Sequence, residues 1–426
     1  MASRWQEIRT GFERSFWVAN FTELFERLAY YGPQAVMAIY LHEHLGLTSE
    51  QTTWLIGYYG FVVWVMPVIG GALADRFGFR NTLAGAFFML AIGNFLLGSL
   101  SSSWMAPLRD ALPLFALMHL IMLVPAMGPA VVKPVVVGTT ARAAQENVRS
   151  VGYSIYYTVV NVGAALGPWL ASQVREDVGV ETVFLMSAAI TLAMAIVTLL
   201  FYREPGKGDE PPTATVAAAL KNLVQVLGNG RFMAFLLIYS GFWVMFWQQY
   251  LSLAIYWRTY RDPNANVDRL LSVEALTVIL LTFIGTYLMR KVRPFTAIVL
   301  GVVVSSFTWL LVAFGNRLEY LVVALVILGI GEVLQAPRYY EYVSRLAPPG
   351  QQGLFMGYAF LPIGIGYLVG GKLAGTLLHQ FGEVRQTPEV MWYVVAAVGF
   401  LTAALLVVYD RMVKPATSEQ VPAAPA

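Results

Sequence analysis

Residues 295–314 read FTAIVLGVVVSSFTWLLVAF, a run of twenty residues without a charged side chain. An α-helix rises 1.5 Å per residue, so twenty residues extend for about 30 Å, which is the thickness of the hydrocarbon core of a bilayer. The stretch therefore predicts a helix that spans a membrane.

The composition of the whole chain agrees with this prediction. Of its 426 residues, 58% are hydrophobic and 12% are charged, and the mean hydropathy is +0.62. An ordinary soluble domain has about 25% charged residues, and a chain this apolar could not cover its surface with polar groups. We therefore expect an all-α membrane protein, and neither a soluble enzyme, a nucleic-acid-binding protein nor a disordered scaffold.

Eleven further stretches have the length and hydropathy of a membrane span. With the first, the twelve predicted spans are residues 15–41, 52–74, 82–101, 112–139, 151–173, 183–202, 231–256, 271–289, 295–314, 320–345, 353–380 and 390–409. The longest connection is rich in Pro, Gly and charge, which is typical of a linker. The predicted organisation is a six-helix bundle (residues 1–202), a cytoplasmic linker (203–230), a second six-helix bundle (231–411) and a disordered tail (412–426).

The distribution of basic residues predicts the orientation. If the N-terminus lies inside, the inner connections carry 17 Lys and Arg and the outer ones carry seven, while four lie within spans. Cytoplasmic loops of membrane proteins are enriched in Lys and Arg. We therefore expect a multi-pass protein of the plasma membrane, the inner membrane in a bacterium, with both termini in the cytoplasm. The net charge of +3 then requires no nucleic-acid partner.

The first predicted span contains charged side chains where apolar ones are expected. Glu23 and Arg27 are four residues apart and share a helix face, Glu26 lies beside them, and Tyr30 and Gln34 continue the polar stripe. One guanidinium cannot neutralise two carboxylates, so we expect one of the two to bind and release a proton. The alternative is a static salt bridge that ties this span to another helix.

Enzyme chemistry has little support in the sequence. The chain has no Cys and only four scattered His, so no nucleophile–base pair and no cluster of metal ligands is evident. We expect no catalytic residues, no metal site and no cofactor, with protons as the coupling ion.

Twelve spans in two sets of six, with both ends inside, resemble the plan of the major facilitator superfamily, whose transporters bind substrate between two halves near the midplane. Residues 70–80, GGALADRFGFR, are similar to the superfamily's loop G-x-L-A-D-R-x-G-R-K. The resemblance implies a conformational role for Gly71, Asp75 and Arg76. The alternative is an ordinary positively charged inner loop.

Residues 23–32, ELFERLAYYG, resemble the signature E-x-x-E-R-F-x-Y-Y-G in the first span of the proton-dependent oligopeptide transporters. The resemblance implies that Glu23, Glu26 and Arg27 take part in proton coupling. It also implies that Arg27 helps to hold the carboxylate of a peptide, with Tyr30 nearby.

Two further motifs of that family have counterparts in the N-terminal half. Residues 128–134, GPAVVKP, resemble G-x-G-x-x-K-P, which makes Lys133 a substrate-binding cation, unless the two glutamates of span 1 simply neutralise it. Residues 157–163, YTVVNVG, resemble Y-x-x-I-N-I-G, whose Tyr and Asn face the peptide. Asn161 could equally serve as a hydrogen bond between helices, so Tyr157 and Asn161 remain candidates.

In the C-terminal half, residues 331–337, GEVLQAP, resemble the motif G-E-x-x-x-S-P, whose Glu receives the substrate's amino group. The resemblance implies that Glu332 binds an ammonium group while cations of the other half bind a carboxylate. A zwitterionic di- or tripeptide would then bridge the two halves.

Several positions depart from the family pattern. Trp247 stands where the family has an acid before Gln248, Gln34 stands where it has a second Arg, and Trp64 stands where it has a Tyr. All four remain candidate substrate-binding residues. Without the span-7 acid, proton coupling must use the glutamates of span 1 or of span 10.

Arg338 in span 10 is also new relative to the family. It lies three residues before Glu341, so the two side chains can pair on one helix face. The alternative is that Arg338 reaches the substrate cavity and contacts an anionic substrate.

The sequence thus predicts a secondary active transporter that imports short peptides or peptide-like zwitterions with protons by alternating access. Its expected partners are the substrate and the lipid bilayer, and we expect it to work as a monomer. One alternative is a superfamily transporter of another substrate, either a symporter of non-peptide carboxylates or a proton-driven exporter of amphipathic compounds. Another is a membrane receptor without transport.

Overall fold

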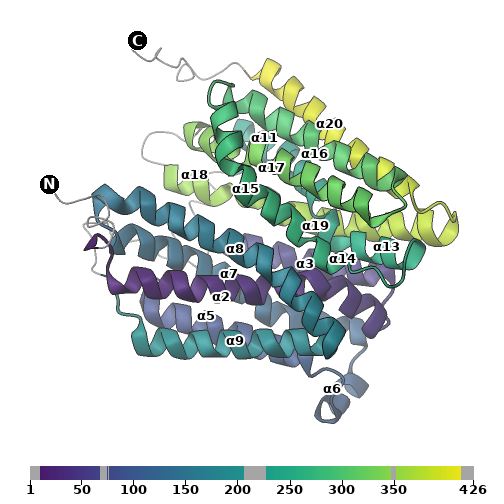
Figure 1. The fold of residues 1–426 in the computed structure, drawn as a ribbon, viewed down its shortest axis with the longest axis horizontal. Coiled ribbons are helices and arrows are strands. Elements are labelled where there is room, and N and C mark those ends of the chain that lie inside the picture. Colours follow the sequence, from purple (N-terminus) through teal and green to yellow (C-terminus); the bar gives the residue numbers. More distant parts are fainter. Residues whose placement is uncertain (1–9, 68–73, 75, 206–226, 347–351, 414–426) are drawn as a thin grey trace.

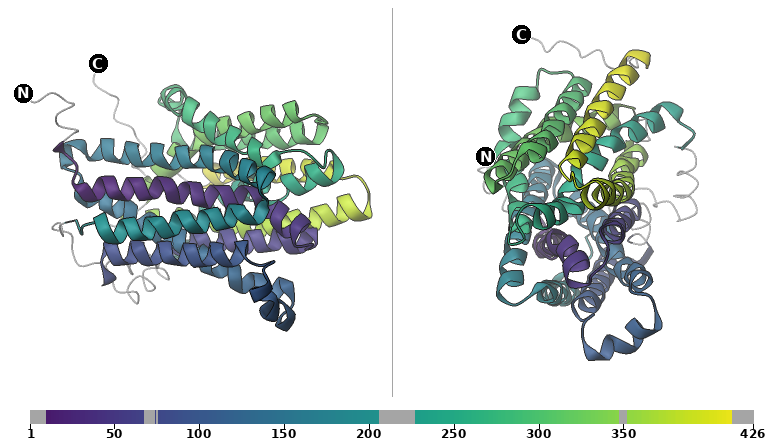
Figure 2. Two further views of the ribbon diagram at one scale, coloured as in Figure 1. Left: turned by 60° about the horizontal axis from the view of Figure 1, so that its bottom comes forward. Right: turned by 90° about the vertical axis from the view of Figure 1, so that its right-hand side faces the viewer.

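The computed structural model of the chain describes residues 10–67, 74, 76–205, 227–346 and 352–413. The helices lie in two groups that follow the order of the sequence, the first purple to teal and the second green to yellow (Figure 1). Figure 2 shows the two groups packed against each other along their length. The predicted linker falls mostly on residues 206–226 and the predicted tail mostly on residues 414–426, so both predictions lie largely outside the described residues.

Within its described residues, the first half contains six long helices. They are α2 (Arg14–Ile39), α3 (Ser49–Val65), α5 (Phe79–Gly98), α7 (Leu114–Ala143), α8 (Arg149–Asp177) and α9 (Val180–Phe201). Shorter elements lie between them, namely η1 (Tyr40–His44), η2 (Ser103–Met105), α6 (Ala106–Ala111) and η3 (Glu146–Val148).

The second half repeats this arrangement, with two of its helices interrupted. Its elements are α11 (Gly230–Phe246), α12 (Gln248–Leu251), α13 (Leu253–Tyr260), α14 (Val267–Leu270), α15 (Ser272–Met289), α16 (Pro294–Phe314), α17 (Leu318–Leu346), α18 (Gln352–Tyr358), α19 (Leu361–Leu377), η4 (Leu378–Val384) and α20 (Val390–Met412).

Each of the twelve predicted spans coincides with a helix or an interrupted helix of the described chain, and the all-α membrane fold is confirmed. Nine helical segments of the described residues are long and apolar enough to cross a bilayer. The predicted spans not among them are α2, α3 and α8. The described part of α3 has only 17 residues. The polar stripe that the sequence singled out lies on α2, and α8 carries the candidate residues Tyr157 and Asn161.

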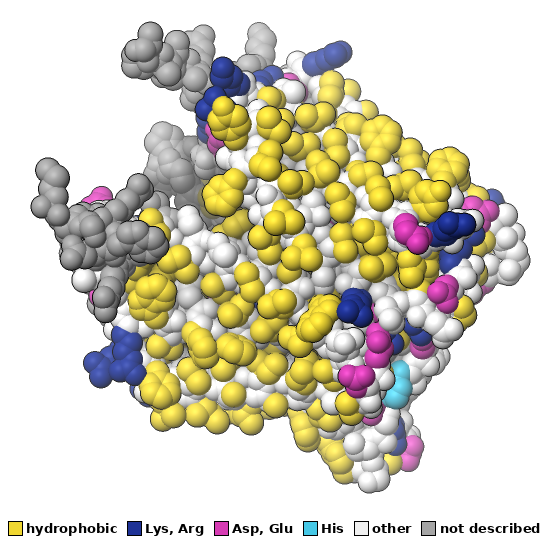
Figure 3. Space-filling view, viewed as in Figure 1, with side chains coloured by type: hydrophobic (Ala, Val, Ile, Leu, Met, Phe, Trp, Pro, Cys, Tyr) yellow, Lys and Arg dark blue, Asp and Glu magenta, His cyan; other side chains and the backbone are white. Residues whose placement is uncertain are grey.

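The surface separates apolar from charged side chains, as in a membrane protein. Large apolar side chains cover the face seen in Figure 3, and most charged side chains gather toward its edges. Phe283 on α15 is 86% exposed and Leu280 is 72% exposed. A soluble protein rarely exposes a contiguous patch of this kind, whereas lipid tails solvate it.

Two helices of the second half are interrupted, and side chains donate hydrogen bonds to backbone carbonyl oxygens at or near these breaks. Between α18 and α19, the Tyr339 hydroxyl donates a hydrogen bond to the carbonyl oxygen of Ala359 at 2.8 Å. At the break between α11 and α12, the Gln248 amide donates to the carbonyl oxygens of Val244 at 3.0 Å and Gly370 at 3.2 Å. Broken helices are tolerated at membrane depth only when such partners exist.

The two halves touch closely along α3 and α19. A Cβ atom added at Gly60 would lie 2.2 Å from the ring of Tyr367, and one added at Gly57 would lie 2.6 Å from the Tyr367 carbonyl oxygen. Only glycine allows this approach of two helices, which is how membrane helices commonly pack.

Polar bridges between the halves gather at one end of the molecule, which we call the far end because it lies opposite the start of α2 and the end of α20. Arg175 of α8 makes hydrogen bonds of 2.8 and 3.2 Å to the buried carboxylate of Asp268 in α14. Glu43 of the first half pairs with Arg258 of α13 at 2.5 Å. Among the described residues, the ion pairs between the halves lie at this end only, so the structure is a state that is closed at the far end.

Candidate functional site

The charged residues of α2 form a buried cluster. The Arg27 guanidinium Nε lies 2.5 Å from a carboxylate oxygen of Glu26 and 3.4 Å from one of Glu23. The relative exposure of Glu23 and Glu26 is zero. Among the described residues, the ion-pair partners of Arg27 come from its own helix, and no salt bridge from this cluster to another helix is observed there. Two buried carboxylates and one cation leave one negative charge without a direct partner, which is costly in a membrane unless a proton or a second cation compensates it.

Several polar atoms of this cluster have no hydrogen-bond partner within the described chain. They are both carboxylate oxygens of Glu23, one of Glu26, Nη2 of Arg27 and the hydroxyl of Tyr30. The Arg27 guanidinium also lies 5.1 Å from the centre of the Tyr30 ring. Buried polar groups are nearly always hydrogen-bonded in folded proteins. Unpaired ones gathered on one helix therefore indicate a site that binds and releases protons or polar ligands.

Lys133 of α7 is the second cation of the first half. Its Nζ lies 4.2 Å from the centre of the Trp64 ring and 4.9 Å from the centre of the Phe360 ring, and these two rings stack on each other. Among the described residues it forms no ion pair with a carboxylate, so direct neutralisation by Glu23 and Glu26 is not observed. Since Phe360 belongs to the second half, the cation–π contact also joins the halves.

Glu332 of α17 has a partner that sequence reasoning missed. Its carboxyl group lies near that of Glu274 in α15, and the two groups interact electrostatically. The two helices approach closely here, because a Cβ added at Gly329 would lie 3.0 Å from the Glu274 carbonyl oxygen. Two neighbouring carboxylates repel each other unless a proton or a cation lies between them. The signal in the sequence was an acidic residue inside the predicted span 271–289.

Tyr31 connects the charged groups of the two halves. The Arg27 guanidinium lies 6.0 Å from the centre of its ring. Tyr31 also packs against the cluster of Ala164, Ala165 and Ala275, the last of which is the neighbour of Glu274. Its hydroxyl interacts electrostatically with Glu274 and Glu332. The cation of the first half and the carboxyl pair of the second therefore lie around one aromatic side chain.

Tyr157 and Asn161 of α8 lie on the side that faces the second half. The Tyr157 side chain interacts electrostatically with Glu332 and is 46% exposed. The Asn161 amide donates to the carbonyl oxygen of Tyr157 on its own helix at 2.8 Å. No hydrogen bond from Asn161 to another helix is present among the described residues, so its packing alternative finds no support there.

The residues that depart from the peptide-transporter pattern form an aromatic group with α19. Gln34 donates a hydrogen bond to the Tyr367 hydroxyl at 3.4 Å, and the Trp247 ring stacks on the Tyr367 ring with centroids 4.1 Å apart. The Gln248 side chain is instead engaged in the helix break, where its Oε1 also accepts a hydrogen bond from Ser252 at 2.7 Å. Trp247 and Gln34 therefore both contact Tyr367 of α19, and Gln248 supports the helix break.

Two other predictions of the sequence have different outcomes. Arg338 pairs with Glu341 at 2.6 Å on one face of α17, as its spacing indicated. Of the predicted conformational loop, Gly71 and Asp75 lie outside the described residues, and Arg76 is exposed over the ring of Phe77 at 5.2 Å. Within the described part of the chain, no group of three acidic or His side chains is arranged to hold a metal ion.

Comparison with known proteins places the chain in a family. The model of the Major Facilitator Superfamily matches residues 20–264 and 264–426. The multidrug resistance protein MdtH of Aeromonas salmonicida is 26% identical over 366 residues, covering 84% of this chain and 87% of that protein. The MdtH of Sodalis glossinidius is 24% identical over 398 residues, covering 91% of this chain and 92% of that protein.

Solved structures share the fold at lower sequence identity. A POT family transporter in complex with 5-aminolevulinic acid superposes with a TM-score of 0.77 at 18% identity, over 94% of this chain and 97% of that one. The nucleoside transporter NupG superposes with a TM-score of 0.78 at 12% identity, over 93% of this chain and 99% of that one. With a family model that spans nearly all of its residues and a fold of two six-helix halves, this chain belongs to the Major Facilitator Superfamily of membrane transporters.

Proposed function

We propose that this transporter is a proton-coupled symporter of short peptides or peptide-like zwitterions that works by alternating access. The observation that carries the proposal is that each half places a different set of charged groups near Tyr31. The buried cluster of Glu23, Glu26 and Arg27 belongs to the first half, and the Glu274–Glu332 carboxyl pair belongs to the second. A zwitterion has the complementary charges.

The substrate carboxylate would bind Arg27 and Lys133. A carboxylate is a good bidentate partner for a guanidinium, and Nη2 of Arg27 has no partner in the described chain. The substrate ammonium would bind Glu332, whose carboxyl group interacts electrostatically with that of Glu274. An incoming ammonium would supply the positive charge and the hydrogen-bond donors that two neighbouring carboxylates lack.

Proton coupling follows from competition for Arg27. When the substrate carboxylate binds the guanidinium, it takes up positive charge that Glu26 and Glu23 otherwise use. Protonation of one glutamate removes that competition, so substrate and proton favour each other's binding. The Glu274–Glu332 pair supplies a second protonatable site in the half where the family acid is replaced by Trp247.

The remaining parts of the proposal concern the setting. Both termini lie in the cytoplasm, the protein functions as a monomer in the bacterial inner membrane, and the far end faces outward. The excess of Lys and Arg in the inner connections supports this orientation.

The proposed activity is tested by uptake of labelled di- and tripeptides into proteoliposomes. We expect accumulation above equilibrium with an inward proton gradient and none after a protonophore is added. Unlabelled dipeptides should compete, and empty liposomes give the background. A folded, monodisperse protein that takes up no peptide under either condition would contradict the peptide assignment.

Alternating access requires the far end to open, which leads to a second test. Asp268→Asn removes the buried carboxylate that holds Arg175. Loss of one partner of a buried ion pair costs about 3–5 kcal/mol. The free energy of the state that is closed at the far end should therefore rise relative to that of the open state. Spin labels on introduced Cys at Asp110 and Asn264, one in each half, should report a longer mean distance in this variant.

The matched control for that experiment is Asp410→Asn. Asp410 pairs with Arg293 within the second half, at the opposite end of the molecule. This variant should leave the distance distribution unchanged. Identical distributions for Asp268→Asn and the parent protein would show that the bridge does not hold the far end closed.

Export of amphipathic compounds is the second candidate function. The two stacked aromatic pairs, Trp64 with Phe360 and Trp247 with Tyr367, support it, as do relatives that carry the name multidrug resistance protein. Under this alternative, cells expressing the protein would tolerate cationic or neutral amphipathic drugs at higher concentration. Proteoliposomes would then show drug-driven proton exchange and no peptide uptake.

A further inference from the structure

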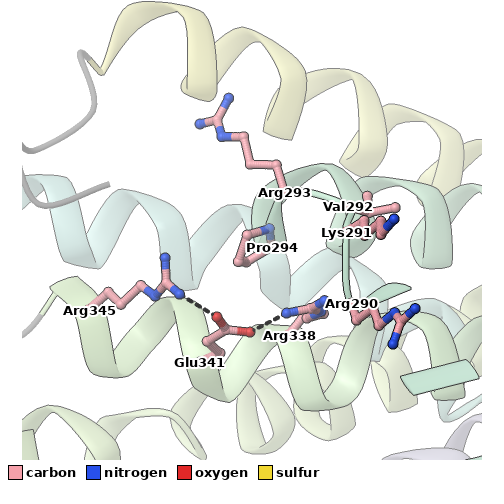
Figure 4. A pocket seen from close by; sticks show the side chains of 8 residues that line it. All are labelled: Arg290, Lys291, Val292, Arg293, Pro294, Arg338, Glu341 and Arg345. Carbon is pink, nitrogen blue, oxygen red and sulfur yellow. Dashed lines mark hydrogen bonds and ion pairs between the residues drawn. The ribbon is translucent and has the colours of Figure 1, made fainter. Parts of the chain in front are cut away.

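A basic pocket lies apart from the candidate site, where α15, α16 and α17 meet at the end that carries the C-terminus of α20. Its volume is about 540 Å³. The charged side chains that line it are Arg290, Lys291, Arg293, Arg338, Glu341 and Arg345. Figure 4 shows these side chains arranged around the connection between α15 and α16 and along one face of α17.

Positive charge exceeds negative charge in this pocket. Five cations line it with one carboxylate, that of Glu341. The carboxylate is shared, because Arg338 lies 2.6 Å and Arg345 lies 2.5 Å from its oxygens. Asp410 of α20, outside the lining, pairs with Arg293.

The remaining two cations of the pocket are exposed, and neither forms an ion pair with a described residue. The guanidinium of Arg290 instead lies over the ring of Tyr287, 4.1 Å from its centre. Even with Asp410 counted, three positive charges are left uncompensated around one cavity, which favours a multiply coordinated anion.

The pocket adjoins the most exposed apolar surface of the second half. On α15, just before Arg290, Phe283 is 86% exposed, and Ile284, Tyr287 and Leu288 are each more than half exposed. In a membrane transporter this face meets lipid tails. The Tyr287 hydroxyl accepts a hydrogen bond from Arg290 at 3.3 Å, and a Tyr beside an Arg at the end of a span is typical of the head-group level of a bilayer.

We propose that this pocket binds the phosphate-bearing head group of an anionic membrane lipid, with the acyl chains lying along α15. Guanidinium groups match phosphate oxygens in bidentate geometry, and basic pockets between membrane helices are suited to acidic head groups. A soluble phosphate would use the same cations and gain nothing from the apolar face. That face is the reason to prefer a lipid.

The proposal is tested on the full-length protein in detergent by native mass spectrometry. Phosphatidylglycerol and phosphatidylcholine with identical acyl chains are titrated separately, and the fraction of protein with one bound lipid gives the affinity. We expect phosphatidylglycerol to bind more tightly. Arg290→Gln/Lys291→Gln should weaken that binding about 10- to 30-fold, since each basic residue near the surface contributes about 1 kcal/mol.

Two further variants separate the pocket from general charge effects. Arg317→Gln/Arg385→Gln removes the same charge from exposed positions at the far end and should leave the affinity unchanged. Glu341→Gln removes the one carboxylate of the lining and should tighten binding, a gain that misfolding cannot imitate.

The proposal would be overturned by equal affinity for the two lipids, or by equal losses of affinity for phosphatidylglycerol in the two double variants. Displacement of phosphatidylglycerol by inorganic phosphate at sub-millimolar concentration would also overturn it, because the ligand would then be a soluble anion. The site would be established if the preference for phosphatidylglycerol is lost in Arg290→Gln/Lys291→Gln but kept in Arg317→Gln/Arg385→Gln, and if it increases in Glu341→Gln.

Discussion

Replacing Glu26 by Gln is expected to abolish accumulation of dipeptide against its gradient while counterflow exchange continues. Glu26 is the carboxylate nearest to Arg27, at 2.5 Å, and it is fully buried. Gln is neutral at every pH, so Arg27 is left with Glu23 as a single compensated pair. The cluster then no longer exchanges a proton when the substrate binds, although the site retains its shape.

The expected effect is large and can be measured in proteoliposomes. A gradient of one pH unit corresponds to about 1.4 kcal/mol per proton, enough for roughly tenfold accumulation with one coupled proton. The ratio of internal to external peptide should fall from about tenfold to one in Glu26→Gln. Exchange of labelled for unlabelled peptide, with no proton gradient, should stay near the parent rate.

Glu146→Gln is the matched control because Glu146 is exposed in a connection of the first half. It should accumulate peptide like the parent protein. If Glu26→Gln also accumulates peptide normally, proton coupling does not use Glu26. If both accumulation and exchange are lost, Glu26 is needed for binding or folding, and its role in coupling is not supported.

Replacing Glu332 by Ala is expected to weaken binding of substrates with a free amino terminus by about 30-fold or more. Truncating one partner of a buried charge pair costs about 2–5 kcal/mol, and 2 kcal/mol is already about 30-fold. The carboxyl group of Glu332 lies in the half opposite Arg27, next to Glu274. It is therefore placed for the end of the substrate that does not contact Arg27.

Competition assays with dipeptides and their N-acetylated forms measure this effect. The parent protein should prefer the free amine, and Glu332→Ala should bind both forms equally. Glu319→Ala, at an exposed position on the same helix, should keep the preference. A parent protein without preference for the free amine would remove the ammonium role from Glu332.

Much of the fold could be predicted from the sequence because the bilayer constrains it strongly. Residues 295–314 and the other apolar stretches must be helical, since backbone groups in lipid can bond only within the helix. The predicted boundaries match the helices closely, as in residues 390–409 against Val390–Met412. The Glu23–Arg27 pair was also predictable, because two residues four apart on a helix always share a face.

Contacts between helices were decided only by the tertiary structure. Glu274 and Glu332 lie 58 positions apart, and nothing local to either indicates that α15 and α17 bring their carboxyl groups together. The stacking of Lys133 on Phe360 likewise depends on how the halves meet. Hydrophobic length specifies that a helix crosses the membrane but not its rotation or its neighbours, because lipid tails solvate every apolar face alike. By itself the sequence determined the helices, their order and the charged face of α2, while the packing of one helix on another decided which charges meet.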